Sequence, residues 1–282
     1  MKASVKPSSI SGMDHMHDTC YTLITGASEG LGKSFVIECA RRNRHIIAVA
    51  LPGPELAFLK SFISNNFPVH IEIIAADLST ESGCKHVFDT VQELGLNVNM
   101  LVNNAGVVMT QPFHELSLHH ALFQARLNVL GTTMMTRYFI NDLLAHTPSY
   151  LLNVSSLSAF FYLPNKQMYG ASKAFVYSFT RSLQAEYRNK NISITVVCPG
   201  GLSSNIRSVL ANNQGGWLAR KSITSPEFVA SKAVQACLDG KEVIIPGRIN
   251  KAFLFLNRLI PSSIKAMITD AQMKKLTVKK SG

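Results

Sequence analysis

The segment Thr25-Gly26-Ala27-Ser28-Glu29-Gly30-Leu31-Gly32 decides the fold of this chain. A short apolar run, Tyr21 to Ile24, precedes it, and a helical stripe of apolar residues follows it. Glycines let a backbone turn sharply and approach a pyrophosphate, and the start of a helix offers free N–H groups and a partial positive charge. In this context a dinucleotide-binding turn is favoured over a glycine turn without a ligand. The predicted cofactor contacts here are Thr25, Gly26, Ser28, Glu29, Gly30, Leu31 and Gly32.

Apolar runs recur along the chain and alternate with longer helical patterns. After the first run they are Ile46 to Leu51, Ile71 to Ala75, Met100 to Val102, Tyr150 to Val154, Ile192 to Val197 and Val243 to Ile245. Near-continuous apolar strands are typical of a sheet that is covered on both faces. Strands that alternate with helices indicate parallel pairing through right-handed crossovers. We therefore predict an α/β fold: a single-domain Rossmann-type, doubly wound parallel sheet with seven strands.

Composition and charge exclude several classes of protein. The chain is 46% hydrophobic and 16% charged, which argues against disorder. Its net charge is +11, but residues 241–282 supply +7 of this, with nine basic and two acidic side chains. The predicted domain has no basic face with interleaved aromatic residues, so we predict no nucleic-acid partner.

The cysteines and the hydropathy pattern indicate a cytoplasmic protein. Five cysteines are scattered without a CxxC pair, which is typical of reduced thiols and predicts neither a disulfide framework nor a metal site. The N-terminal segment does not have the pattern of a secretory signal. The chain also contains no apolar run near the roughly 20 residues needed to cross a bilayer.

A candidate catalytic group lies in the second half of the chain. Tyr169 and Lys173 are four residues apart in a predicted helix and so share one face. Ser156 directly follows the fifth predicted strand, and Asn128 lies in the helical region before it. A phenol can donate a proton to a carbonyl oxygen, and a nearby ammonium is expected to lower its pKa from about 10. Ser156 could bond the same oxygen and stabilise its developing charge.

Taken together, these motifs resemble the short-chain dehydrogenase/reductase family. The resemblance rests on the TGxxxGxG turn, Asn103-Asn104-Ala105-Gly106 after the fourth strand, Pro199-Gly200 after the sixth, and the tetrad Asn128, Ser156, Tyr169 and Lys173. It implies an NAD(P)-dependent oxidoreductase that forms a homodimer or homotetramer. The further cofactor contacts that it implies are Asp77, Leu78, Asn104, Ala105, Gly106, Tyr169, Lys173, Pro199, Gly200 and Ser204. In the family, Lys173 would also bond the nicotinamide ribose, and Asn128 would hold a water that links Lys173 to solvent.

The choice between NADP and NAD depends on the end of the second strand. An acid there bonds the ribose hydroxyls of NAD, and an arginine accommodates the phosphate of NADP. This chain has Ala50-Leu51-Pro52-Gly53, with neither residue. Because the acid is missing, the sequence favours NADP, with NAD as the alternative.

An apolar carbonyl or alcohol is the expected substrate. The C-terminal pattern resembles DltE-like, hydroxysteroid and long-chain ketoacyl reductase members, which is an analogy only. Candidate lining residues are Val108, Met109, Phe160, Phe161, Tyr162, Leu202 and Trp217, and residues 204–224 are long enough for a lid. The alternatives are a catalytically idle dinucleotide-binding sensor or structural protein, and a family epimerase or dehydratase.

The predicted organisation has three parts. Residues 1–18 form a flexible leader, 19–247 the NAD(P)-binding catalytic domain, and 248–282 a basic amphipathic helical tail. The tail could hold the enzyme at a membrane surface, where its lysines would gain from anionic lipids. The alternative is that its helices pack on the domain or on another subunit.

Overall fold

The computed structural model describes residues 19–203 and 223–259. Its centre is a seven-stranded sheet in the order β3-β2-β1-β4-β5-β6-β7, and every neighbouring pair is parallel. The strands are β1 (Cys20–Thr25), β2 (His45–Ala50), β3 (Ile71–Ala75), β4 (Asn97–Asn103), β5 (Ser149–Val154), β6 (Ile192–Val197) and β7 (Val243–Ile244). The order reverses between β1 and β4, which opens a crevice at the carboxyl ends of these strands.

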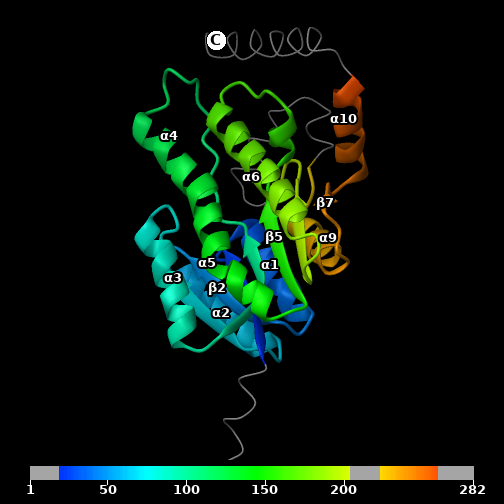
Figure 1. The fold of residues 1–282 in the computed structure, drawn as a ribbon. Helices are drawn as coiled ribbons and strands as arrows, with labels where there is room; N and C mark the ends of the chain where they lie inside the picture. The colour runs from blue at the N-terminus through cyan, green and yellow to red at the C-terminus, as the bar shows by residue number, and fades with distance from the viewer. Residues whose placement is uncertain (1–18, 204–222, 260–282) are drawn as a thin grey trace, which may run out of the picture.

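Helices cover both faces of the sheet (Figure 1). They are α1 (Gly30–Arg41), α2 (Pro54–Asn66), α3 (Glu81–Glu93), α4 (Leu118–Ala125), α5 (Thr132–Ala145), α6 (Gln167–Glu186), α9 (Pro226–Leu238) and α10 (Arg248–Leu259). The π-helix η1 (Arg126–Gly131) joins α4 to α5, and the 3-10 helix η2 (Leu157–Phe160) follows β5. None of the helices in the described ranges is long and apolar enough to cross a membrane.

The core has two layers, one on each side of the sheet. On one face α1, α2 and α9 pack against the strands, with Phe35, Ile63 and Val234 fully buried. On the other face α3 and α5 bury Val87, Phe139 and their neighbours against the same sheet. This double cover explains why the strands are apolar along most of their length. The predicted Rossmann-type parallel sheet of seven strands is confirmed.

Helix α10, the last helix of the described residues, begins where the predicted tail begins. Asn250, 1% exposed, bonds the carbonyl of Pro246 at 2.8 Å, and Leu254 is 9% exposed, so this part of the tail packs on the domain. On its other side Phe255 and Leu256 are exposed. The predicted leader and the rest of the tail lie outside the described residues, so the three-part organisation stays a prediction.

Candidate active site

Asn104 holds the glycine-rich turn in place from the neighbouring strand. Its side-chain amide donates to the carbonyl oxygens of Thr25 and Gly26, at 3.0 and 3.2 Å. The Thr25 hydroxyl accepts the backbone N–H groups of Asn104 and Ala105 and donates to the carbonyl of Val102. The turn after β1 is thereby fixed to the end of β4, at the point where the strand order reverses.

The glycines of the turn leave no room for side chains. Gly26 and Gly30 have φ angles of +64° and +54°, which favour glycine. A Cβ on Gly32 would lie 1.8 Å from the carbonyl oxygen of Gly26, so helix α1 passes directly against the turn. Glu29 is the N-cap residue of α1 and makes no side-chain cap bond. A glycine-lined helix start of this kind fits a pyrophosphate, which needs backbone donors and close approach.

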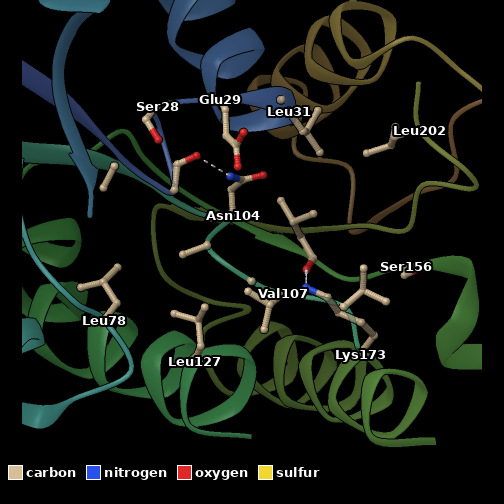
Figure 2. Close-up of a pocket in the computed structure, with 18 of the residues that line it drawn as sticks. Ser28, Glu29, Leu31, Leu78, Asn104, Val107, Leu127, Ser156, Lys173 and Leu202 are labelled. Carbon is tan, nitrogen blue, oxygen red and sulfur yellow. Dashed lines mark hydrogen bonds between the residues drawn. The ribbon is translucent and has the colours of Figure 1, made fainter. Parts of the chain in front are cut away.

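A cavity of about 400 Å³ opens beside this turn (Figure 2). It runs from the ends of β2 and β3, past the glycine turn and the end of β4, to the ends of β5 and β6 and the start of α6. The predicted cofactor contacts that line it are Gly26, Ser28, Glu29, Gly30, Leu31, Gly32, Asp77, Leu78, Asn104, Ala105, Gly106, Tyr169, Lys173, Pro199 and Gly200. An elongated cavity with a phosphate-binding turn at its centre fits a dinucleotide.

Two predicted cofactor contacts are not among the lining residues. Thr25 does not line the cavity but supports the turn, because its hydroxyl accepts the backbone N–H groups of Asn104 and Ala105. Ser204 lies outside the described residues, as do Trp217 and most of the predicted lid.

Asn128 lies behind the cavity wall in the π-helix η1 and is fully buried. Its Oδ1 accepts the N–H of Val107 at 2.9 Å, and its Nδ2 donates to the carbonyl of Val107 at 2.9 Å. The same Nδ2 donates to the Ser172 hydroxyl, which in turn donates to the carbonyl of Tyr169. Asn128 therefore connects the segment after β4 to the first two turns of α6, which carry Tyr169 and Lys173.

Tyr169 lies at the start of α6, facing the end of β5. Its side chain is half-buried, and Ser156 is 9% exposed. Burial raises the pKa of the Tyr169 phenol above its usual value, and hydrogen bonding with Ser156 offsets part of this rise. This direction differs from the expectation that Lys173 lowers the pKa of Tyr169. The physical reason is burial, which is the largest effect on this phenol.

Lys173 is 5% exposed, and its Nζ donates to the carbonyl of Val154 at 2.8 Å (Figure 2). Burial lowers the pKa of this amine from 10.5 to about 8, because a charge in a low-dielectric environment loses its hydration. The Ser155 hydroxyl donates to the backbone carbonyl of Lys173 at 2.7 Å and fixes this part of α6 against β5. Lys173 is thus the basic side chain at the β5 end of the cavity.

Sequence reasoning missed several lining residues. They are Ala76, Val107, Phe123, Leu127, Val154 and Ser155. Phe123 and Leu127 come from α4 and η1, where spacing alone gives no sign that they face a cavity. Of the predicted substrate-lining residues, Val108 and Leu202 line this cavity. Phe161 and Tyr162 line a second, mainly apolar hollow beside η2, and Phe160 packs on Tyr177 instead.

The sequence of residues 21–215 matches the family model for short chain dehydrogenases. Among curated proteins, the mouse 17-beta-hydroxysteroid dehydrogenase type 3 is 29% identical over 211 residues, which are 74% of this chain and 66% of that protein. The bovine very-long-chain 3-oxoacyl-CoA reductase is 29% identical over 195 residues, which are 67% of this chain and 61% of that protein. The chain therefore spans less than two thirds of the length of these relatives.

Solved structures share the fold. A short-chain dehydrogenase from Sphingobium yanoikuyae in complex with NADPH has a TM-score of 0.72 and 21% identity, covering 86% of this chain and 97% of its own. A short chain dehydrogenase/reductase from Burkholderia phymatum in complex with NAD has a TM-score of 0.74 and 20% identity, covering 89% and 96%. At these identities the likeness speaks for the architecture alone.

Proposed function

Because the chain belongs to the short-chain dehydrogenase family, we propose that it is an NAD(P)-dependent oxidoreductase that interconverts a ketone or aldehyde and an alcohol. The observation that carries this proposal is the convergence of Ser156, Tyr169 and Lys173 on one end of a cavity whose centre is the glycine turn. The nicotinamide, when bound, supplies or accepts the two electrons of the reaction.

The cavity offers a complementary group for each part of the cofactor. The glycine turn and the start of α1 would hold the pyrophosphate through backbone N–H groups. Asp77 and Leu78, after β3, line the end for the adenine, and Pro199 and Gly200, after β6, line the end for the nicotinamide. Lys173 would bond the nicotinamide ribose at that second end.

In the reducing direction Tyr169 donates its phenolic proton to the substrate oxygen as negative charge develops there. The raised pKa keeps this phenol protonated at neutral pH, which suits a proton donor. Ser156 donates a hydrogen bond to the same oxygen and stabilises its charge. Lys173, whose pKa is about 8, remains mostly protonated at neutral pH. Its positive charge stabilises the negative charge left on the Tyr169 oxygen after the proton is transferred.

The substrate in this proposal is apolar near its reacting carbon. Support comes from the side chains around the catalytic end, where Val108, Phe123, Leu127 and Leu202 line the cavity. The relatives named for steroid and long-chain acyl substrates point in the same direction by analogy.

The test follows the nicotinamide absorbance of the purified protein with a panel of medium-chain, steroid and small charged keto compounds. Turnover of apolar ketones is the expected result. Dinucleotide binding without any turnover would favour the idle sensor or structural protein over the enzyme. Turnover of small charged keto acids alone would contradict the apolar substrate.

We also propose that the enzyme forms a homodimer or homotetramer in the cytoplasm. Exposed apolar side chains on α4, η1 and α6, namely Leu122, Leu130 and Phe175, support self-association. Light scattering coupled to size-exclusion chromatography tests this, and a monomer at micromolar concentration would contradict it.

A peripheral membrane contact through α10 is the remaining part of the proposal. Phe255 and Leu256 are 64% and 53% exposed on the outer side of this helix, with Lys251 beside them. Apolar and basic side chains on one exposed face suit the headgroup region of an anionic membrane.

A further inference from the structure

The second hollow, of about 380 Å³, lies between the segment that follows β5 and the helix α6. It shares no lining residue with the cavity that holds the catalytic group. Tyr169 and Lys173 lie on one face of α6, whereas the residues of α6 that line the hollow centre on a face roughly 130° further around the helix. The volume of the hollow falls in the range of small-molecule pockets, roughly 300–1,000 Å³. The hollow is therefore a binding space separate from the active-site cavity.

Small side chains on one wall and large apolar side chains on the other give the hollow its shape. Gly170 and Ala174 line it from α6, and Phe161, Tyr162 and Leu163 line it from the segment after η2. Because the helix side has no long side chains at these two positions, space remains between the walls. Apolar walls favour a hydrocarbon chain over water. The hollow thus suits the apolar part of a ligand.

Lys166 supplies the charge of the hollow. Among the described residues that line it, Lys166 alone is ionic, and no carboxylate of the described chain lies within 4 Å of its amine. The side chain is half-buried, and burial lowers the pKa of its amine, because an ammonium loses hydration there. An anion beside it would restore a partner to this cation. Ser158 and Gln167 also line the hollow and carry groups that can donate to an anion.

We propose that the second hollow binds a single-chain amphiphile with a carboxylate head group. The carboxylate pairs with Lys166, and the hydrocarbon chain lies against Phe161 and Leu163. This inference goes beyond the proposed function, because the site requires neither a dinucleotide nor turnover. Charge complementarity selects the ligand: a neutral chain leaves the ammonium without a partner, and a cationic chain is repelled by it.

The test titrates the full-length protein by calorimetry with octanoate, octanol and octyltrimethylammonium, each below the concentration at which it forms micelles. These probes share their chain length and differ in the charge of the head group. Octanoate should bind at a single saturable site. Octanol should bind at least about tenfold more weakly, because it lacks a charge-assisted hydrogen bond to Lys166. Octyltrimethylammonium should bind most weakly of the three, since the ammonium of Lys166 repels it.

Two substitutions assign the binding to the hollow. Lys166→Met removes the charge and keeps an apolar stem, so octanoate should bind at least about tenfold more weakly while octanol affinity changes little. Ala171→Trp adds bulk at an exposed lining position of α6 and should abolish binding of both probes. The matched controls are Lys190→Met, an exposed lysine, and Ser178→Trp, an exposed position of α6 that does not line the hollow. Thermal unfolding checks that each variant folds.

Several outcomes would overturn the proposal. If the wild type does not bind octanoate saturably, the site does not exist. Equal affinities for octanoate and octanol, or unchanged octanoate binding in Lys166→Met, remove the role of the anion. Unchanged binding in Ala171→Trp places the ligand elsewhere. If the wild type binds no octanoate and Ala171→Trp disrupts self-association, a second copy of the chain covers the hollow instead. None of these measurements uses turnover, so the proposal and the proposed function fail independently.

Discussion

Asn104 donates two hydrogen bonds to Thr25, one from its backbone and one from its side chain. The backbone N–H of Asn104 donates to the Thr25 hydroxyl at 2.9 Å, and the Asn104 side-chain amide donates to the Thr25 carbonyl at 3.0 Å. Thr25 is 1% exposed, and its hydroxyl also accepts the N–H of Ala105. The shape of the glycine turn therefore depends on β4, a strand more than seventy residues later in the chain.

We expect Thr25→Val to destabilise the protein and to weaken dinucleotide binding. Valine keeps the shape of threonine but leaves the N–H groups of Asn104 and Ala105 without their acceptor. Because each unsatisfied buried donor costs about 1–3 kcal/mol, the free energy of unfolding should fall by roughly 2 kcal/mol or more. Urea unfolding and calorimetric titration measure the two effects. Thr25→Ser retains the hydroxyl and is the control, and equal stability of the valine and serine variants would contradict this account.

Tyr169→Phe should abolish turnover and leave dinucleotide affinity nearly unchanged. The substitution removes the proton donor and keeps the ring, so the loss in kcat should be at least about 10²-fold. Tyr177→Phe is a matched control on the same helix, because Tyr177 packs its ring on Phe160 and does not line the cavity. More than about a tenth of wild-type turnover in Tyr169→Phe would show that another group supplies the proton.

The sequence predicts the strands well because a sheet covered on both faces needs continuous apolar runs. The bounds of β3 and β6 agree with their runs to the residue. The strand β4 begins before its run, because Asn97 and Val98 pair with β1 although Asn97 is polar. Backbone pairing at a strand end does not require an apolar side chain.

The site was harder to predict where it depends on packing. The π-helix at Asn128 has no compositional signal, and Asn128 bonds Val107 and Ser172, which come from other segments of the chain. Motif spacing brings Tyr169 and Lys173 to one face, but it does not reveal that Lys173 bonds Val154 or that burial raises the pKa of Tyr169. Both the bond of Lys173 and the burial of Tyr169 depend on residues outside α6.

Burial of Lys173 should make the stability of the cofactor-free protein depend on pH. The folded-state pKa of about 8 lies below the ordinary value of 10.5 for a lysine, so between these values the unfolded chain binds a proton that the folded chain lacks. The free energy of unfolding therefore gains from this group as pH rises from 8 toward 10.5, by up to about 3 kcal/mol. Thermal unfolding of wild type and Lys173→Met across this range measures the gain.

The control for this experiment is Lys190→Met, since Lys190 is exposed. The stability difference between wild type and Lys173→Met should grow in favour of wild type as pH rises, whereas that for Lys190→Met should stay flat. A flat difference for Lys173→Met would mean that this amine keeps an ordinary pKa.

The outer face of α10 should bind anionic vesicles. Leu254 and Asn250 anchor the helix to the domain, while Phe255 and Leu256 are exposed, so Phe255→Ser with Leu256→Ser removes apolar surface without touching the anchors. Burying one such side chain contributes about 1.5–3 kcal/mol, so the double variant should bind at least about tenfold more weakly in co-sedimentation. Phe58→Ser is the matched control, because Phe58 is 72% exposed on α2. High salt should weaken binding of the wild type by screening its lysines. If the double variant and Phe58→Ser pellet equally with the vesicles, the face of α10 serves another purpose.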